Sequence, residues 1–262
     1  MASVIINYCS NEKIFLDALL IECSKFSKDI VVSYGSKLYD GSLEDLEHIQ
    51  EYASKYKDVR FVQYEVNLDL DLKVQIGVVN RPTAFWHNLA RYTAVQSLKN
   101  KEWVFVIDCD EIPSGDDVKE WLSKTVLNKE CSYKMANYWY FKYPTNQAKT
   151  FEDSVLLIHS DHLTAKNIFG DLERDYLIPA SGTKLNRMTV GSNKLPMWHH
   201  YSWTRSKESL AHKIKNWAHS NDIFKNTDVD KLIEFIYHND DVNDVIHHYQ
   251  YNKVENTFNI IV

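Results

Sequence analysis

Apolar residues in the first half of the chain form short continuous runs, separated by stretches with helical spacing. The runs are rich in β-branched side chains, which is typical of buried strands. They span residues 4–8, 30–34, 59–66 and 104–107. The stretches between them, with apolar side chains three or four positions apart, span residues 14–20, 43–53 and 85–92. Strands that alternate with helices in this way predict a mostly parallel α/β sheet.

Two of the predicted helices have recognisable starts. Ser42 and Asp45 have the spacing of a capping pair before the second helix. Pro82 can serve as the first residue of the third helix, because its missing N–H is not needed there.

The pattern changes after residue 125. Residues 133–141, 155–159 and 195–203 are predicted to be strands with long irregular connections, which favours a mixed or antiparallel extension of the sheet. From residue 206 onward, apolar side chains recur at helical spacing, so the C-terminal part is predicted to be mainly helical.

Composition narrows the class of protein. The chain has 262 residues, 44% of them hydrophobic, so it can bury a sizeable core. A net charge of −6 without any Lys/Arg-rich run argues against nucleic acid as the main partner. Four cysteines without C-x-x-C spacing favour reduced thiols and a cytoplasmic location. The N-terminal segment predicts a first strand instead of a signal peptide, and no apolar stretch is long enough to predict a membrane span.

The fourth apolar run leads directly into Asp-Cys-Asp-Glu at residues 108–111. Side chains alternate along an extended chain, so Asp108 and Asp110 point to the same side. Carboxylate oxygens are ligands for Mg²⁺ or Mn²⁺, and a site with one or two carboxylates leaves room for substrate phosphates. The alternative is that these acids only cap the next helix, where Ser114 and Asp117 have capping-box spacing. That spacing does not account for Asp108 or Asp110.

Two other clusters offer chemistry. His199 and His200 are neighbours in a predicted strand, so they face opposite sides and only one can reach a shared metal site. One core histidine and one solvated histidine is the alternative. Arg91 shares a helix face with His87 and Asn88, and its planar guanidinium suits a diphosphate; a surface salt bridge is the alternative. Two later cations that could serve the same group are Arg205 and Lys207.

These motifs resemble those of a known family. The Asp-Cys-Asp-Glu-Ile-Pro sequence resembles the Asp-x-Asp signature of GT-A nucleotide-sugar glycosyltransferases, and its ending resembles that of bisecting N-acetylglucosaminyltransferases. His-Tyr-Ser-Trp at residues 200–203 is similar to the Trp-His-Cys-Ser-Trp segment of the latter. Trp-His-Asn-Leu-Ala-Arg at residues 86–91 resembles the Asn-x-x-Arg helix of family-two-like members. The usual acceptor-side signature has no clear match, so sugar and acceptor identity do not carry over.

The resemblance implies a GT-A fold, with a Rossmann-like mixed α/β sheet flanked by helices and a helical C-terminal tail. It implies a catalytic domain over residues 1–205, with a nucleotide-sugar half at 1–125 and an acceptor half at 126–205, before a helical extension at 206–262. The expected enzyme is a metal-dependent glycosyltransferase that uses Mn²⁺ or Mg²⁺. It would move a sugar from a nucleoside-diphosphate sugar, with a UDP sugar favoured, to a glycan or glycoprotein acceptor, with inversion favoured.

The expected roles of individual residues follow from this resemblance. His200 is preferred over His199 because it matches the family's His-x-Ser-Trp. The metal ligands would be Asp108, Asp110 and His200, with Asp110 the direct ligand, Asp108 at the ribose or a metal-bound water, and Glu111 behind them. The nucleotide would be bound by Asn7, Tyr8, Glu12, Asp40, Arg91 and Asp108.

An inverting transfer also needs a general base near the acceptor hydroxyl, usually a carboxylate. The acid-rich loop at residues 170–176 offers three candidates: Asp171, Glu173 and Asp175. Glu152 and Asp153 are weaker candidates, and a retaining enzyme would need no such base. The aromatic run at residues 137–143 suits a sugar-binding wall, in which Tyr138 or Trp139 would touch the ligand.

Three rivals stay open at this point. A phosphatase of the aspartyl-phosphate type also uses Asp-x-Asp after an apolar strand, although usually on its first strand. A catalytically inactive sugar-nucleotide-binding module is the second rival. A nucleotidyltransferase is disfavoured because no Gly-rich phosphate loop follows the first strand.

Overall fold

The computed structural model describes residues 2–39, 41–69, 82–169, 173–216, 227–239 and 247–262. Within these residues one sheet of ten strands runs through the molecule, in the order β3-β2-β1-β4-β7-β6-β9-β5, with β10 paired to β7 and β8 to β6. The strands are β1 Ser3–Tyr8, β2 Ile30–Gly35, β3 Val59–Tyr64, β4 Trp103–Asp108, β5 Glu111–Pro113, β6 Cys131–Phe141, β7 Asn146–His159, β8 Lys184–Thr189, β9 Trp198–Trp203 and β10 Tyr251–Lys253.

The predicted mixed α/β sheet flanked by helices is confirmed. Strands β3, β2, β1 and β4 are parallel neighbours, whereas β7 runs antiparallel to both β4 and β6. The described helices are α1 Lys13–Ser24, α2 Leu46–Lys55, α4 Pro82–Gln96, α5 Gly115–Lys124, α6 Ala165–Ile168, α7 Glu173–Ser181, α8 Lys207–Asn216 and α10 Val229–His238, with 3-10 turns η1 Ser10–Glu12 and η2 Ser160–His162.

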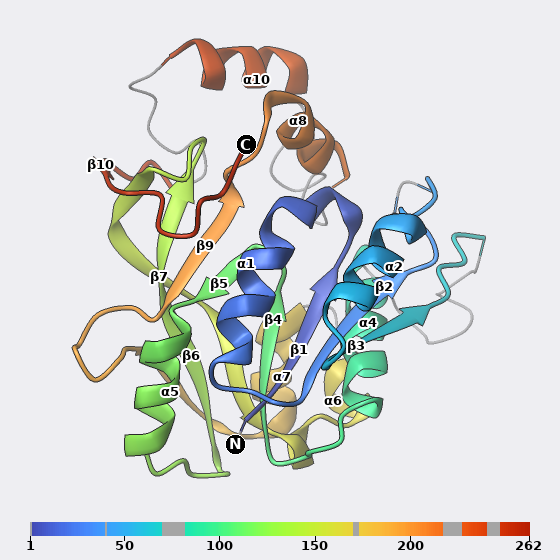
Figure 1. Ribbon diagram of the computed structural model, residues 1–262, viewed down its shortest axis with the longest axis vertical. Coiled ribbons are helices and arrows are strands. Elements are labelled where there is room, and N and C mark those ends of the chain that lie inside the picture. Colours follow the sequence, from blue (N-terminus) through green and yellow to red (C-terminus); the bar gives the residue numbers. More distant parts are fainter. Residues whose placement is uncertain (1, 40, 70–81, 170–172, 217–226, 240–246) are drawn as a thin grey trace.

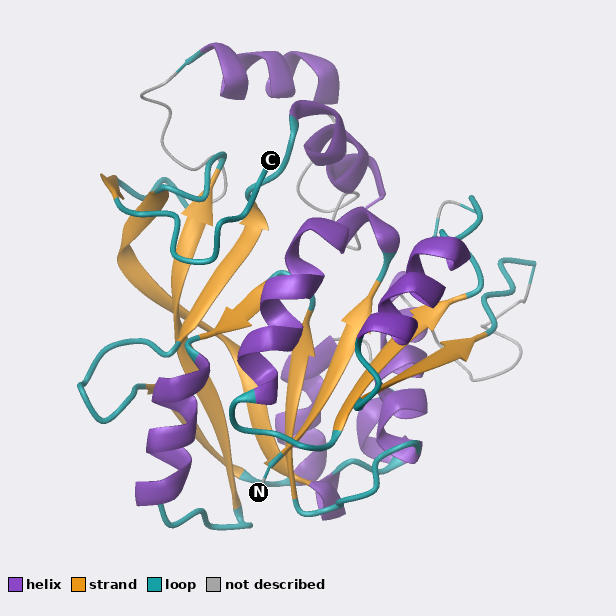
Figure 2. Cartoon of the chain, in the orientation of Figure 1, coloured by secondary structure: helices purple, strands orange, loops and turns teal. Residues whose placement is uncertain are grey.

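Helices cover both faces of the sheet. In Figure 1, α1 and α2 lie in front of the parallel strands and α4, α6 and α7 lie behind them. Two apolar cores match these layers, because β1 sends Val4 and Ile6 into the front core and Ile5 into the rear one. The arrows of the parallel strands point toward the end of the molecule where α8 and α10 lie (Figure 2).

Two helix starts differ from the prediction. The N-cap of α2 is Asp45, whose carboxylate accepts a hydrogen bond from the His48 N–H at 3.1 Å, so Ser42 lies outside the helix. Ser114 is the N-cap of α5 by position, yet its side chain makes no capping bond and lies 3.3 Å from His199 Nε2. Glu22 caps α5 instead, because its carboxylate accepts from the Gly115 N–H at 2.9 Å.

The second half of the sheet also differs in detail. The connection between β6 and β7 is short, at residues 142–145, and not the long irregular one predicted. The C-terminal part is not helical throughout, since β10 pairs with β7 and Phe258 and Ile260 pack against the front core. A division of the chain at residue 205 stays a prediction.

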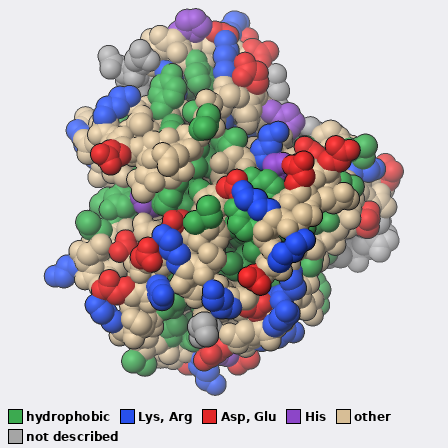
Figure 3. Space-filling view, viewed as in Figure 1, with side chains coloured by type: hydrophobic (Ala, Val, Ile, Leu, Met, Phe, Trp, Pro, Cys, Tyr) green, Lys and Arg blue, Asp and Glu red, His purple; other side chains and the backbone are tan. Residues whose placement is uncertain are grey.

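Surface and thiol features complete the picture. On the face seen in Figure 3, acidic and basic side chains are interspersed. All four cysteines are free thiols. In the part of the chain that the structure describes, every helix is too short or too polar to cross a bilayer.

Candidate functional site

A pocket of about 360 Å³ opens at the carboxyl ends of the parallel strands. In open α/β sheets this edge is where ligands usually bind, and the volume suits a small molecule. Its lining comes from residues as far apart in sequence as Asn7 and His247. The floor is charged, one wall is rich in tyrosine, and the opposite wall carries tryptophan and histidine.

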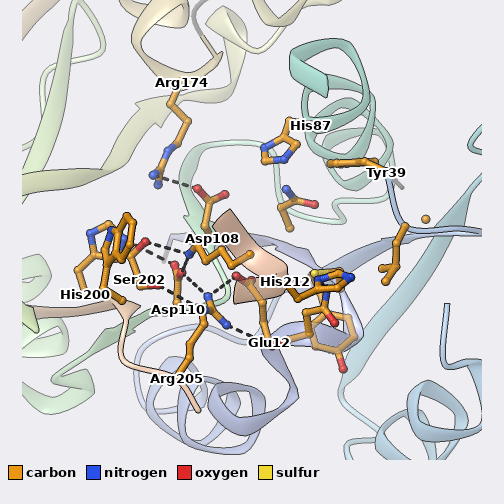
Figure 4. Close-up of a pocket in the computed structure, with 18 of the residues that line it drawn as sticks. Glu12, Tyr39, His87, Asp108, Asp110, Arg174, His200, Ser202, Arg205 and His212 are labelled. Carbon is orange, nitrogen blue, oxygen red and sulfur yellow. Dashed lines mark hydrogen bonds and ion pairs between the residues drawn. The ribbon is translucent and has the colours of Figure 1, made fainter. Parts of the chain in front are cut away.

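Asp110 is the centre of the charged floor and is only 3% exposed. Its Oδ2 accepts hydrogen bonds from Arg205 at 3.0 Å and from Lys213 Nζ at 2.9 Å. Burial alone would raise the pKa of Asp110, but Lys213, His200 and Arg205 outweigh burial and hold that pKa well below its usual range. Asp110 is therefore an anion between two cations. Figure 4 shows it beside Arg205, one of the two.

Asp108, at the end of β4, faces a different pair of cations. Its Oδ1 lies 3.3 Å from Arg91 and its Oδ2 lies 3.1 Å from Arg174. Burial opposes ionisation, yet Arg174 and Arg91 lower the pKa of Asp108 to about 2. Glu111 is fully buried behind it and accepts two hydrogen bonds from Arg174, at 2.6 and 2.8 Å. This bidentate pair fixes the guanidinium that faces Asp108.

Glu12 completes the floor. Its Oε1 accepts a hydrogen bond from Arg205 at 2.8 Å. Burial and the nearby Asp110 raise the pKa of Glu12 to about 7, although Arg205 and Lys213 oppose them. Arg205 is itself 1% exposed, and its guanidinium lies over the Phe15 ring, 5.2 Å from the centroid. The floor is thus rigid and closely balanced in charge.

The tyrosine-rich wall comes from the ends of β1 and β3 and from the segment that follows β2. The Tyr39 and Tyr64 hydroxyls are 3.0 Å apart, and the Tyr39 ring lies 5.1 Å from the ring of His87. The Tyr8 hydroxyl is buried and has no hydrogen-bond partner among the described residues. At Gly35 a Cβ would come within 2.7 Å of the Lys37 carbonyl oxygen, so only glycine lets the chain fold back along this wall.

The adjacent histidines His199 and His200 lie in different environments. His200 lines the pocket, with Nε2 3.6 Å from Asp110 Oδ1. His199 points into the core, where the Tyr140 hydroxyl lies 2.8 Å from its Nδ1, and burial lowers its pKa to about 3. His199 is therefore a neutral packing residue.

A divalent cation fits part of the predicted ligand set. Ligand atoms that each lie 2.0–2.2 Å from one cation can be 3.6 Å apart, which is the separation of His200 Nε2 and Asp110 Oδ1. Both oxygens of Asp108 face guanidinium groups instead. Among the described residues there is no group of three acidic, histidine or cysteine side chains that could hold a metal. Water and phosphate oxygens would have to supply the remaining ligands.

The structure brings most of the predicted nucleotide and metal residues together. Those that line the pocket are Asn7, Tyr8, Glu12, Asp108, Asp110 and His200. Arg91 is instead buried behind Asp108 and forms an ion pair with it. The alternative, a surface salt bridge, is wrong because Arg91 is buried. Lys207 pairs with Glu234 away from the pocket. Trp139 lines the pocket, whereas Tyr138 packs against His199 and Phe151.

The side chains of the three predicted bases lie outside the described residues. Asp40, predicted at the nucleotide, and Asp171 lie outside the described residues. The backbone of Glu173 and Asp175 belongs to helix α7, where a loop was predicted, and their side chains lie outside the description. Their roles stay predictions.

Three pocket residues were not identified as site residues from the sequence. Lys213 belongs to a helix recognised only by its apolar face, and no motif marks it. Arg174 lies among the acids of the predicted base loop, which drew attention away from the cation between them. His247 belongs to no motif identified in the sequence, yet it lines the pocket.

No protein-family model and no curated protein sequence matches this chain. Among solved structures, the inositol-1-phosphate CTP transferase from T. maritima aligns over 83% of this chain and 98% of its own, at 12% identity and a TM-score of 0.46. S. aureus TarS 1-349 aligns over 82% and 64%, at 13% identity and 0.43. The mannosyltransferase PcManGT from Pyrobaculum calidifontis, in complex with GDP-Man and Mn²⁺, aligns over 90% and 68%, at 12% identity and 0.48.

Proposed function

We propose that this chain is a glycosyltransferase that transfers a sugar from a nucleoside-diphosphate sugar to a hydroxyl acceptor. The observation that carries the proposal is the pocket floor, where Arg205 and Lys213 contact the buried carboxylate of Asp110 at the carboxyl edge of the sheet. Two cations fixed in this way are suited to the charge of a diphosphate.

The rest of the pocket suits the other parts of such a donor. The Tyr8, Tyr39 and Gly35 wall offers flat rings and a close backbone approach to a nucleoside, with UDP favoured. On the opposite wall, Trp139 and Trp203 offer apolar area to a sugar ring. A glycan or glycoprotein acceptor remains our preferred second substrate.

The proposed chemistry uses these fixed charges. When the bond between the sugar C1 and the diphosphate oxygen breaks, negative charge grows on the leaving diphosphate. Arg205 and Lys213 stabilise that charge without reorganising, because they are already held by Asp110 and Glu12. A divalent cation bound by Asp110 and His200, Mn²⁺ or Mg²⁺, would supply further Lewis-acid stabilisation.

The experiment is to incubate the full chain with UDP, GDP and CDP sugars and to follow products by ³¹P NMR. Glycosyl transfer predicts the nucleoside diphosphate as the phosphorus product, with loss of turnover in EDTA and its return with Mn²⁺. A phosphatase would leave these donors unchanged, because they carry no phosphomonoester. Release of inorganic phosphate from p-nitrophenyl phosphate, with an acyl phosphate on Asp108, would show that rival. Release of sugar 1-phosphate, as the nucleoside monophosphate passes to water or another acceptor, would show nucleotidyl chemistry. Binding without turnover of any donor would show an inactive module.

A further inference from the structure

The C-terminal strand places a histidine against a carboxylate at the edge of the pocket. Strand β10 pairs antiparallel with β7, so that Tyr251 lies opposite Ala148. The ladder continues in the same register, because the Lys149 N–H donates to the Gln250 carbonyl at 2.9 Å. His247 lies shortly before this segment, and its Nε2 is 3.4 Å from Oε1 of Glu152 on β7.

This pair belongs to the tryptophan wall of the pocket. Asn137 pairs with Glu152 and Trp139 pairs with His200, so alternation puts Glu152, Trp139 and His200 on one face of the sheet. Glu152 and His247 both line the pocket. The Trp139 ring lies edge-on between the two histidines, with its centroid 4.9 Å from each of their rings. The Trp139 ring therefore separates this pair from His200 and the charged floor.

Neighbouring acids do not share this position. Asp153 points to the opposite face, where Arg187 binds it at 2.7 and 2.9 Å and Lys134 lies 3.7 Å away. Its carboxylate is 2% exposed, whereas that of Glu152 is 20% exposed. Of the two acids, only Glu152 can meet a substrate in the pocket.

We propose that Glu152 is the general base of the transfer and that His247 positions it, an inference that rests on the proposed function. The acceptor oxygen forms a bond to C1 of the sugar while its proton passes to Glu152 Oε2. The bond from C1 to the diphosphate oxygen breaks, and its electron pair leaves with the diphosphate. His247 Nε2 lies 3.4 Å from Oε1, which leaves Oε2 for the acceptor proton.

The test compares three variants of the full chain with the wild type: Glu152→Gln, His247→Gln and His247→Ala. Turnover of the donor is followed with water or a sugar as acceptor, donor affinity by calorimetry, and folding by thermal unfolding. We expect Glu152→Gln to lower kcat about 100-fold or more and to leave the donor Kd within threefold. His247→Gln keeps an N–H donor for Glu152 and should retain most turnover, whereas His247→Ala should lose about tenfold.

Several results would overturn this assignment. If Glu152→Gln turned over the donor at the wild-type rate, Glu152 would not be the general base. If both His247 variants lost turnover and Glu152→Gln did not, the histidine would be the proton acceptor instead. A product that retains the anomeric configuration of the donor would also contradict it, because retention needs no such base. These results differ from failure of the proposed function, in which the wild type would release no nucleoside diphosphate from any sugar nucleotide.

Discussion

Four carboxylates in the pocket floor and directly behind it are balanced by four cations. Glu12, Asp108, Asp110 and Glu111 contact Arg91, Arg174, Arg205 and Lys213. Removing one partner from such a buried network leaves an uncompensated charge, which is costly, whereas the intact network can be close to neutral in stability. The network therefore serves to fix charges in place more than to stabilise the fold.

Glu12 gives this network a pH dependence. Its pKa in the folded chain, about 7, is above its usual value of 4.5, so the native state binds this proton more tightly than the unfolded state does. The resulting stability is fully present below about pH 4.5 and is lost as pH rises toward 7. Glu12→Gln removes this titration. The free energy of unfolding of the variant should therefore rise relative to that of the wild type as the pH increases from 5 to 7.5, by at most about 3 kcal/mol.

Urea unfolding at several pH values measures this difference. Glu130→Gln is the control, because Glu130 is an exposed acid far from the floor in sequence. Stability curves for Glu12→Gln and the wild type that stay parallel from pH 5 to 7.5 would contradict the assigned pKa.

At the residue scale, the sequence pointed to the pocket through its acids. Asp108, Asp110 and His200 follow recognisable motifs, and all three line the pocket. Of the cations that bind these acids, Arg91 and Arg205 were singled out from the sequence. Arg174 and Lys213 were not, because an arginine or lysine on a helix looks the same in the sequence whether it faces a pocket or solvent. Only the packing of α7 and α8 against the sheet places Arg174 and Lys213 at the floor.

At the scale of elements, a strand could be predicted from the sequence when it is buried on both faces. Strands β1, β2 and β4 are central and covered on both faces, so their sequences are continuous apolar runs. Strand β8 is mostly exposed or half-buried, and β5 and β10 are three residues long. Such strands form because a partner offers backbone hydrogen bonds, and their own residues give little sign of it.

The C-terminal segment offers a test at this scale. The Asn256 side chain accepts from the Ile260 N–H at 3.0 Å and donates to the Ile260 carbonyl at 2.8 Å, which fixes that residue against the front core. Ile260 is 4% exposed and Ile261 is 83% exposed. Ile260→Ala should lower the free energy of unfolding by about 2–4 kcal/mol, and Ile261→Ala by less than about 0.5 kcal/mol.

Urea denaturation of the two variants provides the measurement. The neighbouring isoleucines are matched in chemistry and sequence position, so they differ mainly in burial. Equal effects of the two substitutions would mean that the segment does not pack on the core as described.

At the scale of the whole molecule, the pocket is assembled from distant parts of one sheet. The parallel half supplies the tyrosine wall and the acids, the antiparallel half supplies Trp139 and Glu152, and the C-terminal region supplies Lys213 and His247. Alternation of strands and helices predicted the first half. It could not predict that the chain returns from residue 206 onward to complete the site, because that return depends on long-range contacts.

The most direct test of the account is calorimetric binding of UDP to the wild type, Lys213→Met and Lys207→Met. Both lysines belong to α8, but Lys213 contacts Asp110 in the pocket while Lys207 pairs with Glu234 outside it. If Lys213 helps to hold the diphosphate, Lys213→Met should weaken UDP binding about tenfold or more, and Lys207→Met should leave it within twofold. Equal affinity of the two variants, or no binding of any nucleoside diphosphate by the wild type, would contradict the account.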